Sequence, residues 1–144
     1  MVCGECGEED RFVRLQGPPT GLRRDRVPNF SHPSTLSAAE WKVVLSSLCV
    51  QRQGGPVVVF SLPKGLISDA WTHEEIDYLS RTLRQAFAQA HPEEWVVFGL
   101  SRPGAPGIAE ITTGGWFMQG THLHLLPTNY RYAVTAPNIR ELVW

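Results

Sequence analysis

Residues 71–90, WTHEEIDYLSRTLRQAFAQA, carry the clearest helical pattern in the chain. Thr72 and Glu75 have the spacing of a capping box, in which the hydroxyl accepts from the Glu75 amide and the carboxylate accepts from the Thr72 amide. Apolar residues then recur at helical spacing until Pro92 ends the pattern. They are Ile76, Leu79, Leu83, Phe87 and Ala90. We therefore expect an amphipathic helix whose apolar stripe packs on another element.

The same helix start occurs earlier in the chain, at Ser37 and Glu40. Apolar positions continue from Trp41 to Cys49, and a Gly-Gly-Pro sequence follows at 54–56. The pattern predicts a helix that ends near Arg52, with Cys49 as a small buried side chain.

Strands are predicted where β-branched and aromatic runs are bounded by Gly and Pro. These runs are 57–60, 95–100, 108–119 and 121–134. The last two should form a hairpin that turns at Gln119-Gly120, with Phe117 opposite His122. Pro127 should place part of the return strand at a sheet edge or bulge. Together these elements predict an α+β fold, in which two amphipathic helices pack on one face of a mainly antiparallel sheet of about four strands.

The chain has 144 residues, which suits one domain. Residues 1–35 are rich in Gly, Pro and charge and lack hydrophobic periodicity. They predict an irregular or flexible N-terminal arm, followed by a single α+β domain over 36–144.

Composition excludes several classes of function. Hydrophobic residues make up 42% and charged residues 19%, and the formal net charge of -1 argues against nucleic-acid binding. No apolar run approaches the roughly 20 residues that cross a bilayer as a helix. Three cysteines do not make a disulfide framework, and Cys3 and Cys6 have only half of the ligand spacing of a zinc site.

His122 and His124 form the pattern most suggestive of chemistry, because alternation in a strand places both imidazoles on one face, about 7 Å apart. A metal needs three or four ligands, and residues 125–136 contain no Asp, Glu, Cys or His. We therefore predict no metal and no cofactor. The alternative is a metal-binding protein or metal-dependent enzyme that uses this pair. Its third ligand could come from His32, His73, His91 or Glu110.

The predicted hairpin places Phe117 and a glycine-sized gap on the same face as the two histidines, which suggests a niche for a small ligand. Tyr130 and Tyr132 alternate with Arg131, so their rings should share a face and could contact a ligand. No nucleophile elbow or phosphate loop occurs, so no catalytic residue is predicted. The candidate ligand- or partner-binding residues are Phe117, His122, His124, Tyr130 and Arg131.

Short motifs in the second half of the chain carry a resemblance to known proteins. They are Ser101-Arg102-Pro103, Pro106-Gly107, TTGGWF at 112–117, Leu123-His124-Leu125 and Asn129-Tyr130-Arg131. From about residue 27 onward the chain resembles a group of uncharacterised bacterial envelope lipoproteins. The resemblance implies a periplasmic or envelope-associated location, a removed signal peptide and a membrane anchor through an N-terminal lipid. Neither Cys3 nor Cys6 follows an apolar run, which departs from that group.

These observations favour a non-enzymatic binding or assembly domain. We expect its partner to be another protein or a second copy of the chain, and not a nucleic acid. An oligomeric structural subunit is a further alternative.

Overall fold

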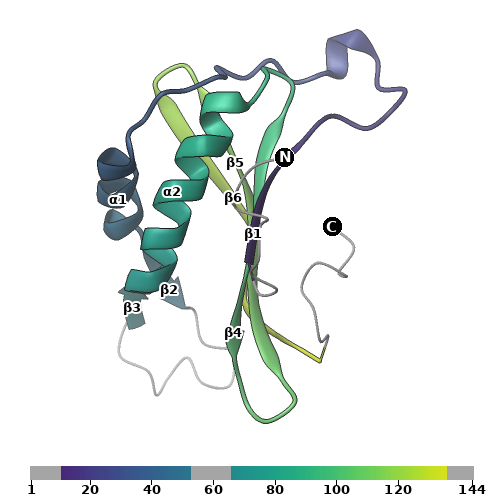
Figure 1. The fold of residues 1–144 in the computed structure, drawn as a ribbon. Helices are drawn as coiled ribbons and strands as arrows, with labels where there is room; N and C mark the ends of the chain where they lie inside the picture. The colour runs from purple at the N-terminus through teal and green to yellow at the C-terminus, as the bar shows by residue number, and fades with distance from the viewer. Residues whose placement is uncertain (1–10, 53–65, 136–144) are drawn as a thin grey trace.

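The computed structural model describes residues 11–52 and 66–135. Its helices are α1 (Ala38–Ser47) and α2 (His73–Gln89), with a short 3-10 turn η2 (Arg24–Arg26). Its strands are β1 (Arg11–Gln16), β2 (Cys49–Arg52), β3 (Leu66–Asp69), β4 (Trp95–Pro103), β5 (Ala109–Gln119) and β6 (His122–Val134). Figure 1 shows their arrangement.

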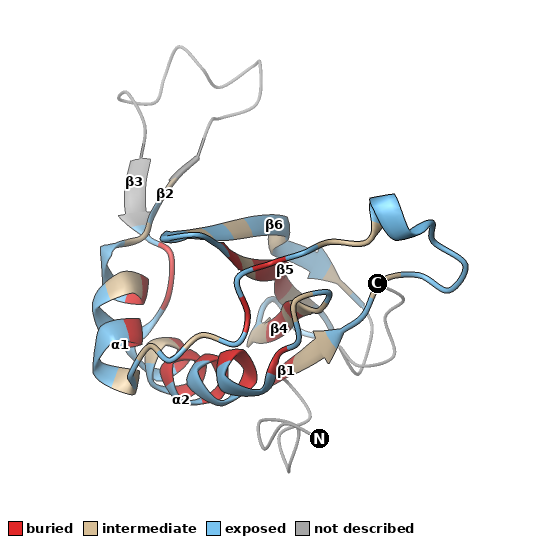
Figure 2. Ribbon diagram, turned by 90° about the horizontal axis from the view of Figure 1, so that it is seen from above, coloured by how far each residue is buried: buried red, intermediate tan, exposed pale blue. Residues whose placement is uncertain are grey.

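Four strands form an antiparallel sheet in the order β1-β4-β5-β6, and β2 and β3 pair separately as a two-stranded ribbon. Both helices lie on the same side of the four-stranded sheet (Figure 2). This arrangement confirms the predicted α+β fold. The core lies between helices and sheet, and its largest fully buried side chains include Trp41, Phe87, Phe98 and Trp116.

Both helices begin as the sequence predicts. Ser37 and Glu40 form a complete capping box before α1, and Thr72 and Glu75 form one before α2. Each box satisfies backbone amides that the first helical turn leaves without partners. The starts of the two helices are therefore fixed by local chemistry.

The predicted end of the first helix is wrong. Helix α1 stops at Ser47, Leu48 is extended, and residues 49–52 form β2, paired with β3. Cys49 is consequently exposed rather than buried. Tertiary pairing with β3 outweighs the helical spacing of these residues, because a strand partner supplies hydrogen bonds that a last helical turn would have made.

The prediction of an irregular segment over 1–35 does not hold at residues 11–16. These residues form β1, which pairs with β4 along its whole length and supplies the fourth strand. Val13 and Leu15 face the helices and pack in the core, while Phe12 lies on the opposite face. The predicted strand at 57–60 lies outside the described residues.

The β5–β6 hairpin has a different register from the predicted one. Phe117 lies opposite His124 and Gln119 opposite His122, so the turn is at Gly120-Thr121. The pairing is displaced by two residues, and since side chains alternate with a period of two, residues 122–127 keep their predicted faces. The turn moves because Gly120 has a positive φ of 60°, which favours glycine inside the turn.

β6 is an edge strand. Its register with β5 shifts between Gly114 and Thr113 and again between Thr113 and Ile111. Pro127 lies beside the first irregularity, which confirms its predicted edge or bulge position. Arg131, with a φ of 51°, lies at the second. The extra residue there turns Tyr130 and Tyr132 to opposite faces, so the prediction that their rings share a face is wrong.

Candidate ligand-binding site

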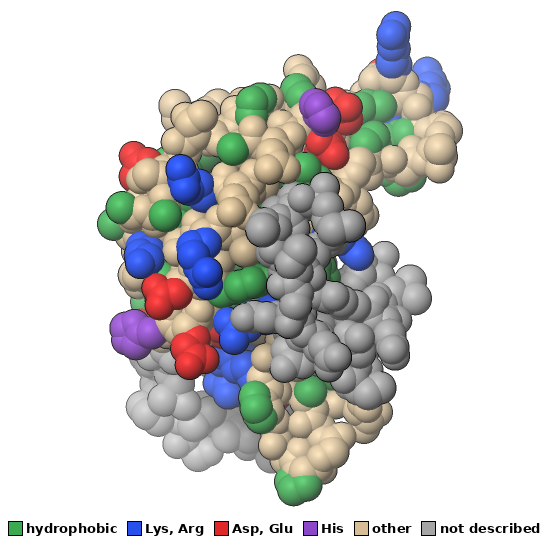
Figure 3. Space-filling model, viewed as in Figure 1, with side chains coloured by type: hydrophobic (Ala, Val, Ile, Leu, Met, Phe, Trp, Pro, Cys, Tyr) green, Lys and Arg blue, Asp and Glu red, His purple; other side chains and the backbone are tan. Residues whose placement is uncertain are grey.

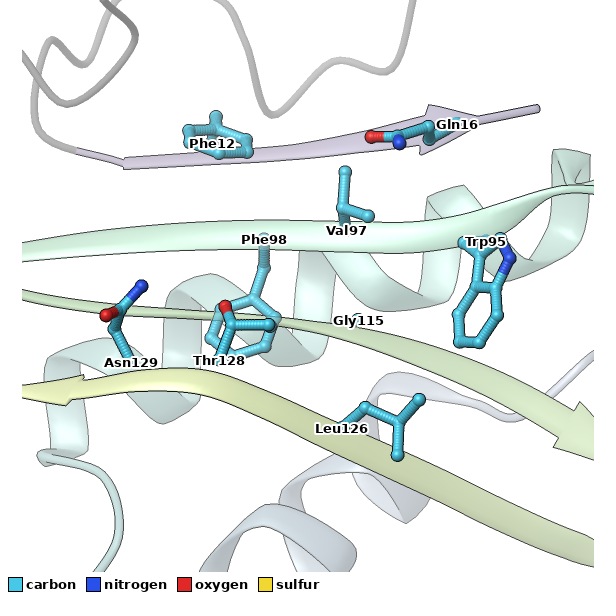
Figure 4. A pocket seen from close by; sticks show the side chains of 10 residues that line it. Phe12, Gln16, Trp95, Val97, Phe98, Gly115, Leu126, Thr128 and Asn129 are labelled. Atoms are coloured by element: carbon cyan, nitrogen blue, oxygen red, sulfur yellow. The ribbon is translucent and has the colours of Figure 1, made fainter. Parts of the chain in front are cut away.

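The sheet has an outer face, directed away from both helices, and this face contains a hollow of about 420 Å³. All four strands contribute to its lining (Figure 4). A volume in this range suits a small organic ligand. The residues that define its floor and walls are Phe12, Trp95, Val97, Gly115 and Leu126.

Two glycines on the outer face explain why the hollow exists. A Cβ on Gly99 would overlap the Phe12 ring, so that ring already occupies the space beside Gly99. A Cβ on Gly115 would meet its nearest atoms, Trp95 Cε3 and Val97 Cγ1, at 3.4 and 3.9 Å, which is ordinary van der Waals contact. A Cβ at this position would therefore fit without displacing a neighbour, and the Gly115 backbone forms part of the lining of the hollow.

Aromatic rings form a wall next to the hollow. Phe117 stacks on His124 with ring centroids 4.5 Å apart and planes 7° from parallel. Phe30 also stacks on Phe117, with ring centroids 4.6 Å apart, and Trp95 meets Phe117 edge to face at 4.9 Å. Such pairs are stabilising beyond their buried area, so the wall has a defined shape.

Polar groups close the end of the hollow at the first β6 irregularity. Thr113 Oγ1 lies 2.7 Å from Thr128 Oγ1 and accepts a hydrogen bond from Asn129 Nδ2 at 2.9 Å. These bonds hold Thr128 and Asn129 in place at the edge of the hollow, where both line it. Gln16 on β1 supplies a second amide. The lining thus combines an apolar floor with neutral hydrogen-bonding groups.

The structure separates the five candidate residues into two groups. Phe117, His122 and His124 lie together on the outer face, with the two imidazole centroids 6.5 Å apart. Tyr130 instead donates from its hydroxyl to the Ala70 carbonyl at 3.1 Å, and Arg131 Nε pairs with Glu110 at 2.8 Å. Within residues 11–52 and 66–135, no three His, Cys, Asp or Glu side chains are grouped to hold a metal ion.

None of the five predicted site residues is among the residues that line the hollow. Phe12 and Gln16 belong to the segment that was expected to be irregular, although Val13 and Leu15 alternate with Arg14 and Gln16 as strand residues do. Trp95 and Val97 belong to a predicted strand, but their position around Gly115 depends on pairing between distant segments. Periodicity alone does not give that pairing.

A loop segment fixes the aromatic wall to the sheet. The amides of Phe30 and Ser31 donate to the carbonyls of Pro92 and Met118, both at 2.7 Å. The buried His32 accepts from the Met118 amide through Nε2 at 3.0 Å. Burial lowers the pKa of His32 below its ordinary value, although the nearby backbone of His91 and Glu94 opposes this effect. The imidazole is therefore neutral, which its acceptor role requires.

A second hollow, of about 410 Å³, lies beside the start of α2 and is lined by charged side chains. Arg102 Nε donates to Glu75 Oε2 at 2.8 Å, and its second nitrogen pairs with the other carboxylate oxygen. Burial acts to raise the pKa of Glu75, but bonds from Arg102 and the Thr72 amide outweigh it and hold the pKa below its ordinary value. This cluster joins α2 to β4, and its charges are already compensated.

Charged side chains on the helix side are of mixed sign, as the surface over α1 and α2 shows (Figure 3). Lys42 Nζ, for example, lies 3.3 Å from an Asp77 oxygen between the two helices. Exposed pairs of this kind contribute little and mark no ligand site. No helix in the described parts of the chain is both long and apolar enough to cross a bilayer.

Comparison with known proteins gives no further guide to the site. No family model, no curated protein and no solved structure matches the chain.

Proposed function

We propose that the protein is a non-enzymatic binding domain that holds a small, largely apolar molecule in the outer-face hollow. The observation that carries this proposal is the hollow itself, whose lining includes Gly115, Trp95, Val97 and the half-exposed Leu126. An exposed apolar surface that is concave and rimmed by neutral polar groups is typical of a ligand site. Leu126 is 48% exposed, a large fraction for an apolar side chain in a strand.

The lining favours binding over catalysis. General acid–base or nucleophilic chemistry needs a titratable or nucleophilic group within hydrogen-bond reach of the substrate. The described side chains that line the hollow are apolar, apart from the neutral amides of Gln16 and Asn129 and the hydroxyl of Thr128. They can position a ligand but offer no proton acceptor near neutral pH.

The proposal predicts that Gly115→Val weakens the binding of a neutral apolar probe, because the added isopropyl group occupies part of the hollow. The probe is 2-naphthalenemethanol, and the measurement is quenching of tryptophan fluorescence on titration, since Trp95 lines the hollow. We expect the variant to bind about tenfold more weakly or worse than the native chain.

The matched control is Ala133→Val, which places the same isopropyl side chain at an exposed position of β6 outside the hollow. It should bind the probe as the native chain does. Both variants must show the native circular dichroism spectrum. Equal binding by Gly115→Val and the native chain would contradict the proposal.

Location and macromolecular partners rest on the sequence alone. We propose an envelope-associated protein from the resemblance to envelope lipoproteins, and a protein partner or self-association from the absence of a basic surplus. Fractionation of cells that express the full gene, with an alkyne-labelled fatty acid, tests the first proposal. Native mass spectrometry of the purified chain tests the second.

A further inference from the structure

We infer that the ligand of the outer-face hollow is a flat aromatic acid, whose ring lies over Gly115 and whose carboxylate pairs with Arg14. The inference rests on the proposed binding function and adds the chemical class of the ligand. It is supported by the position of Arg14, by the charges of the outer face and by the shape of the lining.

Arg14 lies beside the hollow in the same cross-strand row as its floor. Arg14 pairs with Val97, and Val97 pairs in turn with Gly115. Its guanidinium carbon lies 5.0 Å from the centroid of the Phe12 ring, which lines the hollow. The contact with this ring keeps the guanidinium close to the sheet and next to the rim.

In the described parts of the four strands, no carboxylate on the outer face compensates the charge of Arg14. Among the described residues, Arg14 has no ion pair. The outward positions of the four strands also carry His122 and His124 but no Asp or Glu, because Glu110 faces the helix side with Arg131. Arg14 thus places a positive charge beside the hollow, and this charge favours an anion.

The lining favours a flat ring over a branched aliphatic chain. The absence of a side chain at Gly115 lets a planar group approach the backbone, and the Trp95 ring stands at one side of this space (Figure 4). Aromatic rings gain from edge-to-face and offset contacts with such a side chain. A ring over Gly115 lies in the next row from Phe117 and His124, so it would extend the aromatic wall.

Two probes of nearly the same shape test the inference. The first is 2-naphthoate, which has a carboxylate, and the second is 2-naphthalenemethanol, which has a neutral hydroxymethyl group. We expect the native chain to bind 2-naphthoate about fivefold more tightly at low ionic strength, a typical gain from one partly exposed ion pair. This preference should decrease as salt is added.

Three variants assign the preference to its source. Arg14→Gln should bring the affinity ratio of the two probes close to one, while Arg14→Lys should keep most of it. Arg26→Gln, which removes the same charge from the exposed turn η2, should leave the ratio unchanged. Gly115→Val should weaken the binding of both probes.

The outcomes separate this inference from the proposed function. If both probes bind with equal affinity and Gly115→Val weakens both, the hollow is a binding site but the acid is not its ligand. If Arg26→Gln lowers the affinity ratio of the two probes as much as Arg14→Gln does, Arg14 does not have the proposed role. If neither probe binds the native chain, the proposed function fails and the inference fails with it.

Discussion

At the scale of single residues, the site depends on two glycines, Gly99 and Gly115, at outer-face positions of the sheet. They differ in the atoms that a side chain at each position would meet. The Phe12 ring would overlap a Cβ on Gly99, whereas a Cβ on Gly115 would make only ordinary van der Waals contacts. The glycine-sized gap at Gly115 could be predicted from the alternation of β5. The filled gap at Gly99 could not, because it depends on the pairing of β1 with β4, which places Phe12 opposite Gly99.

This difference predicts opposite effects of one substitution. Gly99→Ala should lower the free energy of unfolding by about 1–3 kcal/mol, because the new methyl group displaces the buried Phe12 ring. Gly115→Ala should raise it by about 0.5–1 kcal/mol, since alanine loses less conformational freedom in a strand. Urea denaturation of both variants measures the two changes. Equal destabilisation would show that the space over Gly115 is filled.

His32 predicts a pH dependence of stability. Its pKa is lower in the folded chain than the ordinary value of 6.5, so the unfolded chain binds the proton more tightly. The free energy of unfolding should have its full value above pH 6.5. It should decrease as the pH falls from 6.5 through the lower pKa of the folded chain. In His32→Gln, whose amide oxygen can still accept from Met118, the decrease between pH 7 and 5 should be smaller. Chemical denaturation at a series of pH values tests this, and an unchanged slope would rule it out.

At the scale of elements, helix starts could be predicted and helix ends could not. A capping box is a local structure, so Ser37 with Glu40 and Thr72 with Glu75 specify it without tertiary partners. The end of α1 depends on pairing of β2 with β3, two segments that are distant in the sequence. Glu75 also has a tertiary role that no local pattern indicates, because it joins α2 to Arg102 of β4.

Loss of this ion pair should destabilise the fold strongly. Glu75 is 6% exposed, so Glu75→Ala should lower the free energy of unfolding by about 3 kcal/mol, as removal of one partner leaves a poorly solvated charge on Arg102. The double variant Glu75→Ala with Arg102→Met should regain part of this loss. A double-mutant cycle by urea denaturation measures the coupling free energy between Glu75 and Arg102. If the losses of unfolding free energy in the two single variants simply add in the double variant, the pair is not coupled.

At the scale of the whole molecule, the layer architecture follows from amphipathic patterns, whereas the site follows from topology. Two apolar helix stripes and alternating strands predicted helices on one face of an antiparallel sheet, which the structure has. The hollow requires β1 at the sheet edge, the two-residue displacement of β6 and its irregularity at Thr128. These long-range pairings bring Phe12, Trp95 and Leu126 around Gly115.

The most direct test of the binding site is a two-dimensional ¹H–¹⁵N NMR titration of the native chain with 2-naphthalenemethanol. The predicted result is a set of shift changes concentrated at the amides of Gly115, Leu126 and Thr128 and at the Trp95 indole, with the helix-side residues unaffected. Shift changes confined to α1 and α2, or none at millimolar probe, would contradict the account.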